Sequence, residues 1–336
     1  MSEPQISQQS RLYNFLNEWE NEDGIKVHTS GSTGVPKEIN LKKEILVKSA
    51  KRTIKHFGIN KHSRLHSSVS FEYIGGKMMI VRSLVSGCQL TFSEPSQRPQ
   101  PPEGKNKVDL ISIVPAQMPY ILEHLDDYKI VKNFLLGGSA IDSRLWNRIV
   151  ESGITAWESY GMTETASHIA LRRITGSASS RPRFVPLPGI KISMDFDDRL
   201  HIYDGANFFT TNDVGKVYKD GSFEVLGRKD DIIISGGIKM NPLVIEDKLN
   251  PYLEEELETF FITSLPDEQW TSRIILVGTP YDKENVGENN IERKIENIIK
   301  TIPSSILPNR ERPKEIRIIE EIPRTSNDKI IRKLKI

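Results

Sequence analysis

The apolar residues of this chain follow two periodicities, and together they predict an α/β fold. Between residues 41 and 57 the apolar positions fall mostly on one face of a helix, and Gly58 is suited to end that helix. Short apolar runs at residues 108–114 and 133–136 predict buried strands, and a further helix is expected at residues 142–150. The first half of the chain therefore alternates strands with helices, which is typical of α/β proteins.

A different pattern follows in the second half. Residues 191–196 and 200–203 alternate apolar and polar positions around Asp197-Asp198, which predicts a hairpin in a β-rich subdomain. The chain then mixes strand and helix patterns and ends in a basic tail. We expect a large N-terminal α/β core with this β-rich subdomain at residues 1–226, and a small, mobile C-terminal α+β domain at residues 227–336.

Composition sets the outer bounds. With 336 residues, 37% of them hydrophobic and 27% charged, the chain is long enough for two soluble domains. A net charge of +1 gives no overall field that favours nucleic acid. The only cysteine, Cys88, excludes an intrachain disulfide and is expected to be buried. No stretch approaches the about 20 apolar residues of a membrane span, and the first residues lack a leader pattern, so a cytoplasmic location is expected. The oligomeric state is left open, a homodimer included.

The clearest chemical signal is a loop at residues 29–37, which reads Thr-Ser-Gly-Ser-Thr-Gly-Val-Pro-Lys. Gly31 and Gly34 let main-chain N–H groups approach a phosphate, the hydroxyls add donors, and Lys37 adds a positive charge. The loop is not a Walker A motif, because Pro36 precedes the lysine and Glu38 follows it. We expect the order strand, phosphate loop, helix here. Taken alone, the loop could equally be a surface turn.

Five further motifs follow in order along the chain. They are Tyr-Gly-Met-Thr-Glu at 160–164, Thr-Asn-Asp at 211–213, Gly-Arg-Lys-Asp-Asp at 227–231, Ser-Gly-Gly-Ile-Lys at 235–239 and Pro-Arg-Thr-Ser-Asn-Asp-Lys at 323–329. In order and spacing the series resembles the adenylate-forming superfamily, which contains acyl-CoA synthetases, adenylation domains of peptide synthetases, and luciferases. Members usually carry a longer region before the first loop, so this chain resembles a short form of the acyl-CoA synthetase branch.

The resemblance implies that the protein activates a small carboxylic acid with ATP and Mg²⁺ and passes it to CoA. In this chemistry the acid attacks the α-phosphate of ATP, pyrophosphate leaves, and a thiol then displaces AMP from the acyl-adenylate. The reaction depends on positioning and on neutralising phosphate charge. It therefore calls for a lysine, a metal ion and backbone donors rather than for a nucleophilic triad.

Most of the matched residues would bind the nucleotide. The resemblance assigns ATP or AMP binding to Thr29, Ser30, Gly31, Ser32, Thr33, Gly34, Lys37, Gly138, Ser139, Tyr160, Gly161, Met162, Thr163, Asp213, Arg228 and Lys329. Within this set, Tyr160 would stack on adenine, Asp213 would hold the ribose hydroxyls, and Arg228 would contact ribose or phosphate. Core packing is the alternative for Tyr160 and Met162. For Asp213 with Arg228 the alternative is a structural salt bridge.

Catalysis would depend on Lys329, Thr163 and Glu164. Lys329 would bridge the acid and the α-phosphate, Thr163 would bond the α-phosphate, and Glu164 would bind Mg²⁺ as a hard oxygen ligand. The alternatives are a solvated carboxylate for Glu164 and one more solvated charge in a basic tail for Lys329. The family usually has glycine where this chain has Asn212 and Asp328.

Two further groups would serve the second half of the reaction. Asp230 resembles the hinge residue about which the C-terminal domain rotates between the adenylating and thioester-forming arrangements. Ser235, Gly236 and Gly237 would line the passage for the pantetheine of CoA. Otherwise these three residues form a plain glycine turn between strands.

The acid would bind beside residues 73–87, where the family has its acyl-pocket helix. The residues assigned to it are Tyr73, Lys77, Arg82 and Gly137. Two cations in this place suit an acid with a second carboxylate. Within the family, this short form is most similar to the ligases that activate o-succinylbenzoate in menaquinone biosynthesis. The alternative is that Lys77 and Arg82 extend their charges into water.

Three functions stay open at this point. The first is an AMP-forming acid:CoA ligase, the second an adenylation enzyme that loads another aryl or acyl acid onto a carrier protein, and the third a degenerate nucleotide-binding protein. The chain retains together the five charged residues Lys37, Glu164, Asp213, Arg228 and Lys329. Their joint retention favours a working enzyme.

Overall fold

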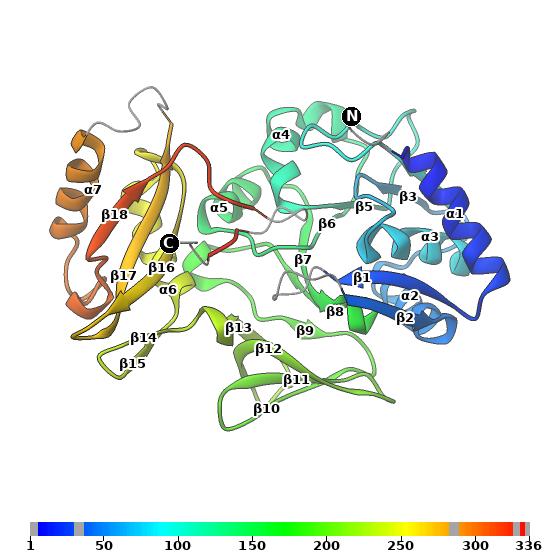
Figure 1. Cartoon of the computed structure of the whole chain (residues 1–336). Coiled ribbons are helices and arrows are strands. Elements are labelled where there is room, and N and C mark those ends of the chain that lie inside the picture. The colour runs from blue at the N-terminus through cyan, green and yellow to red at the C-terminus, as the bar shows by residue number, and fades with distance from the viewer. Residues whose placement is uncertain (1–5, 30–36, 282–288, 325–329, 333–336) are drawn as a thin grey trace.

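The computed structural model describes residues 6–29, 37–281, 289–324 and 330–332 (Figure 1). Within them the largest sheet has seven strands in the order β4-β3-β5-β6-β7-β8-β9. The strands are β3 Arg64–Ser67, β4 Gln89–Phe92, β5 Leu110–Ile113, β6 Phe134–Leu136, β7 Ala156–Met162, β8 Ser167–Arg173 and β9 Val185–Pro186. Pairing is parallel from β4 to β7 and antiparallel from β7 to β9. The strands expected at 108–114 and 133–136 are confirmed as β5 and β6.

Helices cover both faces of this sheet. They are α1 Gln8–Asn21, α2 Lys43–Phe57, α3 Ile74–Ser86, α4 Met118–Glu123 and α5 Ser143–Glu151. Gly58 ends α2 with a φ of +64°, as the sequence predicts. Asp142 caps α5, because its side chain accepts a hydrogen bond of 2.7 Å from the N–H of Leu145. None of the helices in the described parts of the chain is long and apolar enough to cross a membrane.

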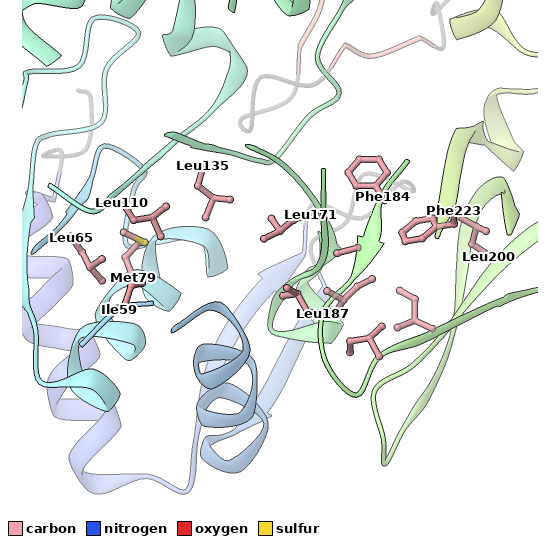
Figure 2. Close-up of a cluster of buried hydrophobic side chains, with 14 of the residues drawn as sticks. Ile59, Leu65, Met79, Leu110, Leu135, Leu171, Phe184, Leu187, Leu200 and Phe223 are labelled. Carbon is pink, nitrogen blue, oxygen red and sulfur yellow. The ribbon is translucent and has the colours of Figure 1, made fainter. Parts of the chain in front are cut away.

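Alternate residues of the central strands supply two separate cores. Leu110 and Leu135 point to one face, where they join Met79 of α3 and continue to Phe223 of the β-rich sheet (Figure 2). Ile111 and its neighbours Phe134 and Leu136 point to the other face and pack around Trp146 of α5. Strands buried on both faces explain the continuous apolar runs of β5 and β6. Cys88 is buried as expected.

The β-rich part is an antiparallel sheet in the order β10-β11-β12-β13. Its strands are β10 Lys191–Met194, β11 Arg199–Tyr203, β12 Phe208–Val217 and β13 Phe223–Arg228. β10 and β11 pair directly, which confirms the predicted hairpin. Leu200 and Phe223 of this sheet belong to the same hydrophobic core as Leu110 of the central sheet (Figure 2).

The C-terminal part contains two further sheets and two helices. The elements are β14 Ile233–Ser235, β15 Ile238–Met240, α6 Pro242–Leu253, β16 Leu257–Asp267, β17 Thr271–Pro280, α7 Asn289–Thr301 and β18 Glu315–Ile318. β14 pairs with β15, and β16-β17-β18 form a mixed sheet at the opposite end of the molecule from α1 (Figure 1). Short 3-10 turns of the described residues lie at Pro115–Gln117, Leu125–Tyr128, Thr163–Thr165, Ala178–Ser180, Lys229–Asp231 and Asn309–Glu311. The α/β fold class is confirmed.

The expected order of strand, phosphate loop and helix is wrong in one respect. The loop lies between β1 Gly24–Thr29 and a second strand, β2 Lys37–Lys42, and Thr29 pairs with Lys37 across this hairpin. Helix α2 begins only at Lys43. The reason is the period-two pattern of β2, in which Leu41 lies opposite Ile25 and Ile39 opposite Val27. No helix N-terminus therefore follows the loop directly.

Candidate active site

Three of the motifs meet where the central sheet joins the β-rich sheet. Tyr160 on β7 donates a hydrogen bond of 2.7 Å from its phenol oxygen to Oδ2 of Asp213 on β12. Asp213 lies opposite Arg228 of β13 in the antiparallel register. Burial and the nearby Asp213 carboxylate raise the pKa of the Tyr160 phenol, so the group stays a neutral donor. The structure thus brings together residues 53 and 68 positions apart in sequence, counted from Tyr160 to Asp213 and to Arg228.

The ring of Tyr160 packs in the protein interior. Its centroid lies 5.3 Å from that of Phe223, edge to face, and 5.8 Å from that of Phe184. Met162 also packs against the first core. Core packing, the alternative interpretation of both residues, is therefore part of their role, and stacking of Tyr160 on adenine stays a prediction.

The turn after Tyr160 has a backbone that requires its glycine. A side chain at Gly161 would place Cβ 2.3 Å from the carbonyl oxygen of Ser167, in the bulge where β7 meets β8. Thr165 fixes the turn further, because its hydroxyl lies 3.1 Å from the N–H of Met162 and 2.9 Å from the carbonyl of Ser167. Thr163 and Glu164 are held in this turn, half-buried.

Glu164 is the predicted ligand of the magnesium ion, and its half-buried side chain lies in this turn. Its carboxylate has no ion-pair partner in the described parts of the chain, and no cluster of three or more metal-binding side chains occurs there. Mg²⁺ bound beside phosphates commonly takes only one or two carboxylates and fills its shell with phosphate oxygens and water. The residues present therefore fit a magnesium ion that arrives with ATP.

The turn Gly137-Gly138-Ser139 lies beside Tyr160. It leaves β6, and Gly138 has a φ of +98°, which favours glycine. A Cβ on Gly137 would lie 2.6 Å from Oγ of Ser159, the residue that precedes Tyr160. The close approach places this turn against the edge of the site, where the sequence predicts walls for both the nucleotide and the acid.

Arg82 is the most unusual charged residue in the described structure. It is 1% exposed, its Nη1 donates to Sδ of Met79 at 3.4 Å, and its Nη2 lies 3.5 Å from Nδ1 of His168. Its Nε has no hydrogen-bond partner, and none of the described carboxylates is close enough for an ion pair. Burial lowers the pKa of the guanidinium to about 9. The alternative in which Arg82 extends its charge into water is wrong.

Lys77 on the same helix points elsewhere. Its ammonium group donates a hydrogen bond of 2.9 Å to the carbonyl of Lys26 in β1. Tyr73 is the N-cap residue just before the helix, and its carbonyl accepts from the N–H of Lys77 at 3.0 Å. The structure therefore does not bring Lys77 and Arg82 together on one anion.

The predicted hinge has an unexpected contact. Asp230 lies in the exposed turn Lys229–Asp231 and accepts a hydrogen bond from the side chain of Asn212, the residue that stands where the family usually has glycine. Lys229 pairs with Asp197 at 2.8 Å. Sequence reasoning missed the bond from Asn212: the departure from glycine marked the position but did not identify its partner.

The predicted CoA residues form a tight hairpin turn. Gly236 and Gly237 connect β14 to β15 with φ values of +56° and +77°, and Ser235 precedes them. The N–H of Gly236 donates to the carbonyl of Trp270 at 2.8 Å. The glycine-turn alternative describes this geometry, and a role in CoA binding stays a prediction.

Several assigned residues cannot be placed. Ser30, Gly31, Ser32, Thr33, Gly34 and Lys329 lie outside the described residues. For Thr29 and Lys37 the structure gives the backbone pairing in the β1–β2 hairpin. Sequence reasoning also missed His168, although it follows the 160–164 motif by only four residues.

Comparison with known proteins identifies the family to which the chain belongs. The family model of the AMP-binding enzymes matches residues 25–221. A 2-succinylbenzoate–CoA ligase from Lactococcus lactis is 27% identical over 331 residues, which cover 92% of this chain and 70% of that ligase.

Two solved structures are similar over most of the chain. An acyl-CoA synthetase (AMP-forming)/AMP-acid ligase II-like protein from Dyadobacter fermentans is 28% identical with a TM-score of 0.61, over 98% of this chain and 94% of that one. O-succinylbenzoate coenzyme A synthetase from Bacillus subtilis, in complex with AMP, has a TM-score of 0.75 over 91% of this chain and 67% of that one. At 20% identity this second likeness shows the shared fold.

Proposed function

Because the chain belongs to the AMP-binding enzyme family, we propose that it is an AMP-forming acid:CoA ligase whose acid is 2-succinylbenzoate. The curated relative of that name supports the substrate, since it aligns with 92% of this chain. The observation that carries the proposal is Arg82, a fully buried guanidinium on the predicted acyl-pocket helix that has no anionic partner among the described residues. A cation so placed suits an acid that keeps one free carboxylate.

The first half-reaction joins the acid to AMP. A carboxylate oxygen of the acid attacks the α-phosphorus of ATP, and the bond to pyrophosphate breaks. Thr163 would donate to the α-phosphate, and Lys329 would bridge the α-phosphate and the attacking carboxylate. The positive charge of the lysine would reduce the repulsion between these two negative groups. Glu164 would hold the magnesium ion, which neutralises phosphate charge during the transfer. The loop from Thr29 to Lys37 would hold the departing phosphates.

The adenosine part would be held by Tyr160 and Asp213. The phenol of Tyr160 donates to Oδ2 of Asp213, which fixes the carboxylate and leaves its other oxygen for a ribose hydroxyl. Arg228, opposite Asp213 in the sheet, would add a donor for ribose or phosphate. Gly138 and Ser139 would form the adjoining wall.

The second half-reaction transfers the acyl group to CoA. The thiol of CoA attacks the acyl carbon, AMP leaves, and the thiol proton passes to solvent. We propose that the chain divides into an N-terminal domain, residues 1–226, and a C-terminal domain, residues 227–336. The C-terminal domain would rotate about a hinge near Asp230 to reach the arrangement for this step. In its support, none of the described hydrophobic clusters combines residues from both parts. Ser235 to Gly237 would then face the pantetheine. We place the enzyme in the cytoplasm, where ATP and CoA are supplied.

The substrate assignment is tested by thioester formation across a panel of acids. The reaction would contain ATP, Mg²⁺, CoA and either 2-succinylbenzoate, benzoate or a medium-chain fatty acid. The proposal expects a strong preference for 2-succinylbenzoate. Equal rates with the monocarboxylic acids would contradict the assignment of 2-succinylbenzoate as the substrate. Pyrophosphate release without any thioester would contradict CoA as the acyl acceptor and would favour a carrier protein.

A further inference from the structure

Three polar side chains from three elements form a buried chain beneath the candidate site. Thr53 of α2, His168 of β8 and Arg82 of α3 are exposed by 0%, 4% and 1% respectively. Oγ1 of Thr53 lies 3.0 Å from Nε2 of His168, and Nδ1 of His168 lies 3.5 Å from Nη2 of Arg82. Met79, the other contact of Arg82, belongs to the apolar core shown in Figure 2. The three groups therefore have few alternative polar partners.

The direction of the hydrogen bonds follows from chemistry. A guanidinium can only donate, so Nδ1 of His168 must present its lone pair to Arg82. The ring proton is then on Nε2, where it donates to the hydroxyl of Thr53. Burial and the charge of Arg82 hold the pKa of His168 well below its usual range, so the neutral form that this arrangement needs is the stable one.

The chain of side chains reaches the active-site motif through the backbone. His168 is the register partner of Gly161, the second residue of the 160–164 motif. The two backbones are so close that a Cβ on Gly161 would lie 2.5 Å from Cα of His168. The ring of His168 therefore connects Arg82 to the strand that carries Tyr160.

We propose that His168 positions the guanidinium of Arg82 for the second carboxylate of the acid, and that it thereby sets the preference of the enzyme for dicarboxylic acids. This inference rests on the proposed function. His168 engages one N–H of Arg82, and within the described parts of the chain others, Nε–H among them, have no partner. A carboxylate can accept from two guanidinium N–H groups at once. Because Arg82 is 1% exposed, side chains around it must move when the acid binds.

The test compares acids that differ by one carboxylate. The substrates are 2-succinylbenzoate and the two analogues that lack one of its carboxylates, 4-oxo-4-phenylbutanoate and 2-propanoylbenzoate. KM and kcat are measured for each, or an inhibition constant where an analogue does not react. His168→Leu removes the acceptor and should raise KM for 2-succinylbenzoate about ten-fold, the effect of losing one hydrogen bond to a charged group, with little change for the analogues.

Two further variants separate positioning from packing. His168→Asn keeps an acceptor near the position of Nδ1 and should restore most of the preference for 2-succinylbenzoate. Thr53→Val removes only the partner of Nε2 and should cause a smaller rise in KM. The matched control is His66→Leu, which replaces another buried histidine of the same sheet and should leave the ratio of KM values unchanged.

The outcomes distinguish this inference from the proposed function. If the wild-type enzyme shows no preference for 2-succinylbenzoate, the proposed function fails. If the preference exists and His168→Leu changes KM equally for all three acids, His168 is only a packing residue and the inference fails. If His168→Leu does not fold, the KM values of His168→Asn and Thr53→Val for the three acids are compared with those of the wild type. Equal changes for all three acids would again contradict the inference.

Discussion

The phenol oxygen of Tyr160 lies 2.7 Å from Oδ2 of Asp213, and this hydrogen bond joins the central sheet to the β-rich sheet. The two residues come from motifs about fifty positions apart, yet they form one unit in which the tyrosine orients the carboxylate. In the proposed function this unit holds the adenosine, with residues contributed by two sheets. It also explains why Tyr160 is both a core residue and part of the site.

Loss of the Tyr160 hydroxyl should weaken ATP binding. In Tyr160→Phe the carboxylate of Asp213 loses a donor, and KM for ATP should rise about ten-fold, as expected for a hydrogen bond to a charged group. The kinetics of pyrophosphate release measure this effect. Tyr203→Phe, at a half-exposed tyrosine of β11, is the matched control. An unchanged KM for ATP in Tyr160→Phe would remove Asp213 from the ribose site.

Arg82 should lower the stability of the substrate-free protein and, in return, strengthen the binding of 2-succinylbenzoate. In Arg82→Met a buried cation with no carboxylate partner among the described residues is replaced by an apolar side chain of similar length. This change should raise the free energy of unfolding at pH 7 by about 1 to 3 kcal/mol. The same change should raise KM for 2-succinylbenzoate at least about 30-fold, because a buried charge pair with the substrate is lost.

Urea unfolding and initial rates test the two parts of this prediction for Arg82 separately. A stability gain with a loss of substrate binding marks a residue that is maintained for function. A variant that is less stable and equally selective would show that Arg82 serves the fold alone.

Glu164 should determine the requirement for magnesium. In Glu164→Gln the ligand charge is lost, and the Mg²⁺ concentration for half-maximal pyrophosphate release should rise about ten-fold or more. Excess chelator should abolish the reaction of the wild-type enzyme. Glu151→Gln, at an exposed acid that ends α5, is the control and should behave as wild type. Identical magnesium titrations for both variants would exclude Glu164 as the ligand.

His66 should make the protein sensitive to acid. It is 3% exposed, its Nδ1 contacts Oγ1 of Thr91 at 2.9 Å, and none of the described residues bonds its Nε2. Burial, and then the charge of Arg64, lower its pKa from 6.5 to about 4. Between these values the unfolded chain binds the proton more readily, so stability rises with pH from about 4 to 6.5 and is lost as the pH falls through that window.

Urea unfolding at several pH values measures this dependence. The lowered pKa of His66 corresponds to about 3 kcal/mol across the window. His66→Gln should reduce the change in the free energy of unfolding across this pH range by that amount. The change that His168 contributes should remain, because burial lowers the pKa of His168 as well. His62→Gln, at an exposed histidine, should keep the full slope. A profile that is unchanged in His66→Gln would contradict the assignment.

Local patterns predicted much of the fold, and they identified candidate site residues of which some lie together in the structure. Apolar runs predict β5 and β6 because parallel strands are buried on both faces, and the motifs at 160–164, 211–213 and 227–231 contain residues that do meet in space. The helix expected from residue 41 begins at Lys43, since Leu41 fits a strand as well as a helix. Period alone does not distinguish the two over so short a run.

Contacts between distant positions could not be predicted in this way. The contact of Arg82 with His168 spans 86 positions, and the bond between Asn212 and Asp230 crosses from a strand to a turn. Such pairs depend on how elements pack, and no local pattern in the sequence encodes them. Arg82 could therefore be predicted as a cation in the acid pocket, but its deep burial and its histidine partner could not.

The stoichiometry of products from 2-succinylbenzoate, ATP, Mg²⁺ and CoA decides whether the reaction passes through an acyl-adenylate. AMP, pyrophosphate and the CoA thioester should appear in equal amounts, and none of them should form when the acid is omitted. Formation of ADP and phosphate, or of thioester without AMP, would contradict an acyl-adenylate route and with it the roles given to Thr163, Glu164 and Lys329.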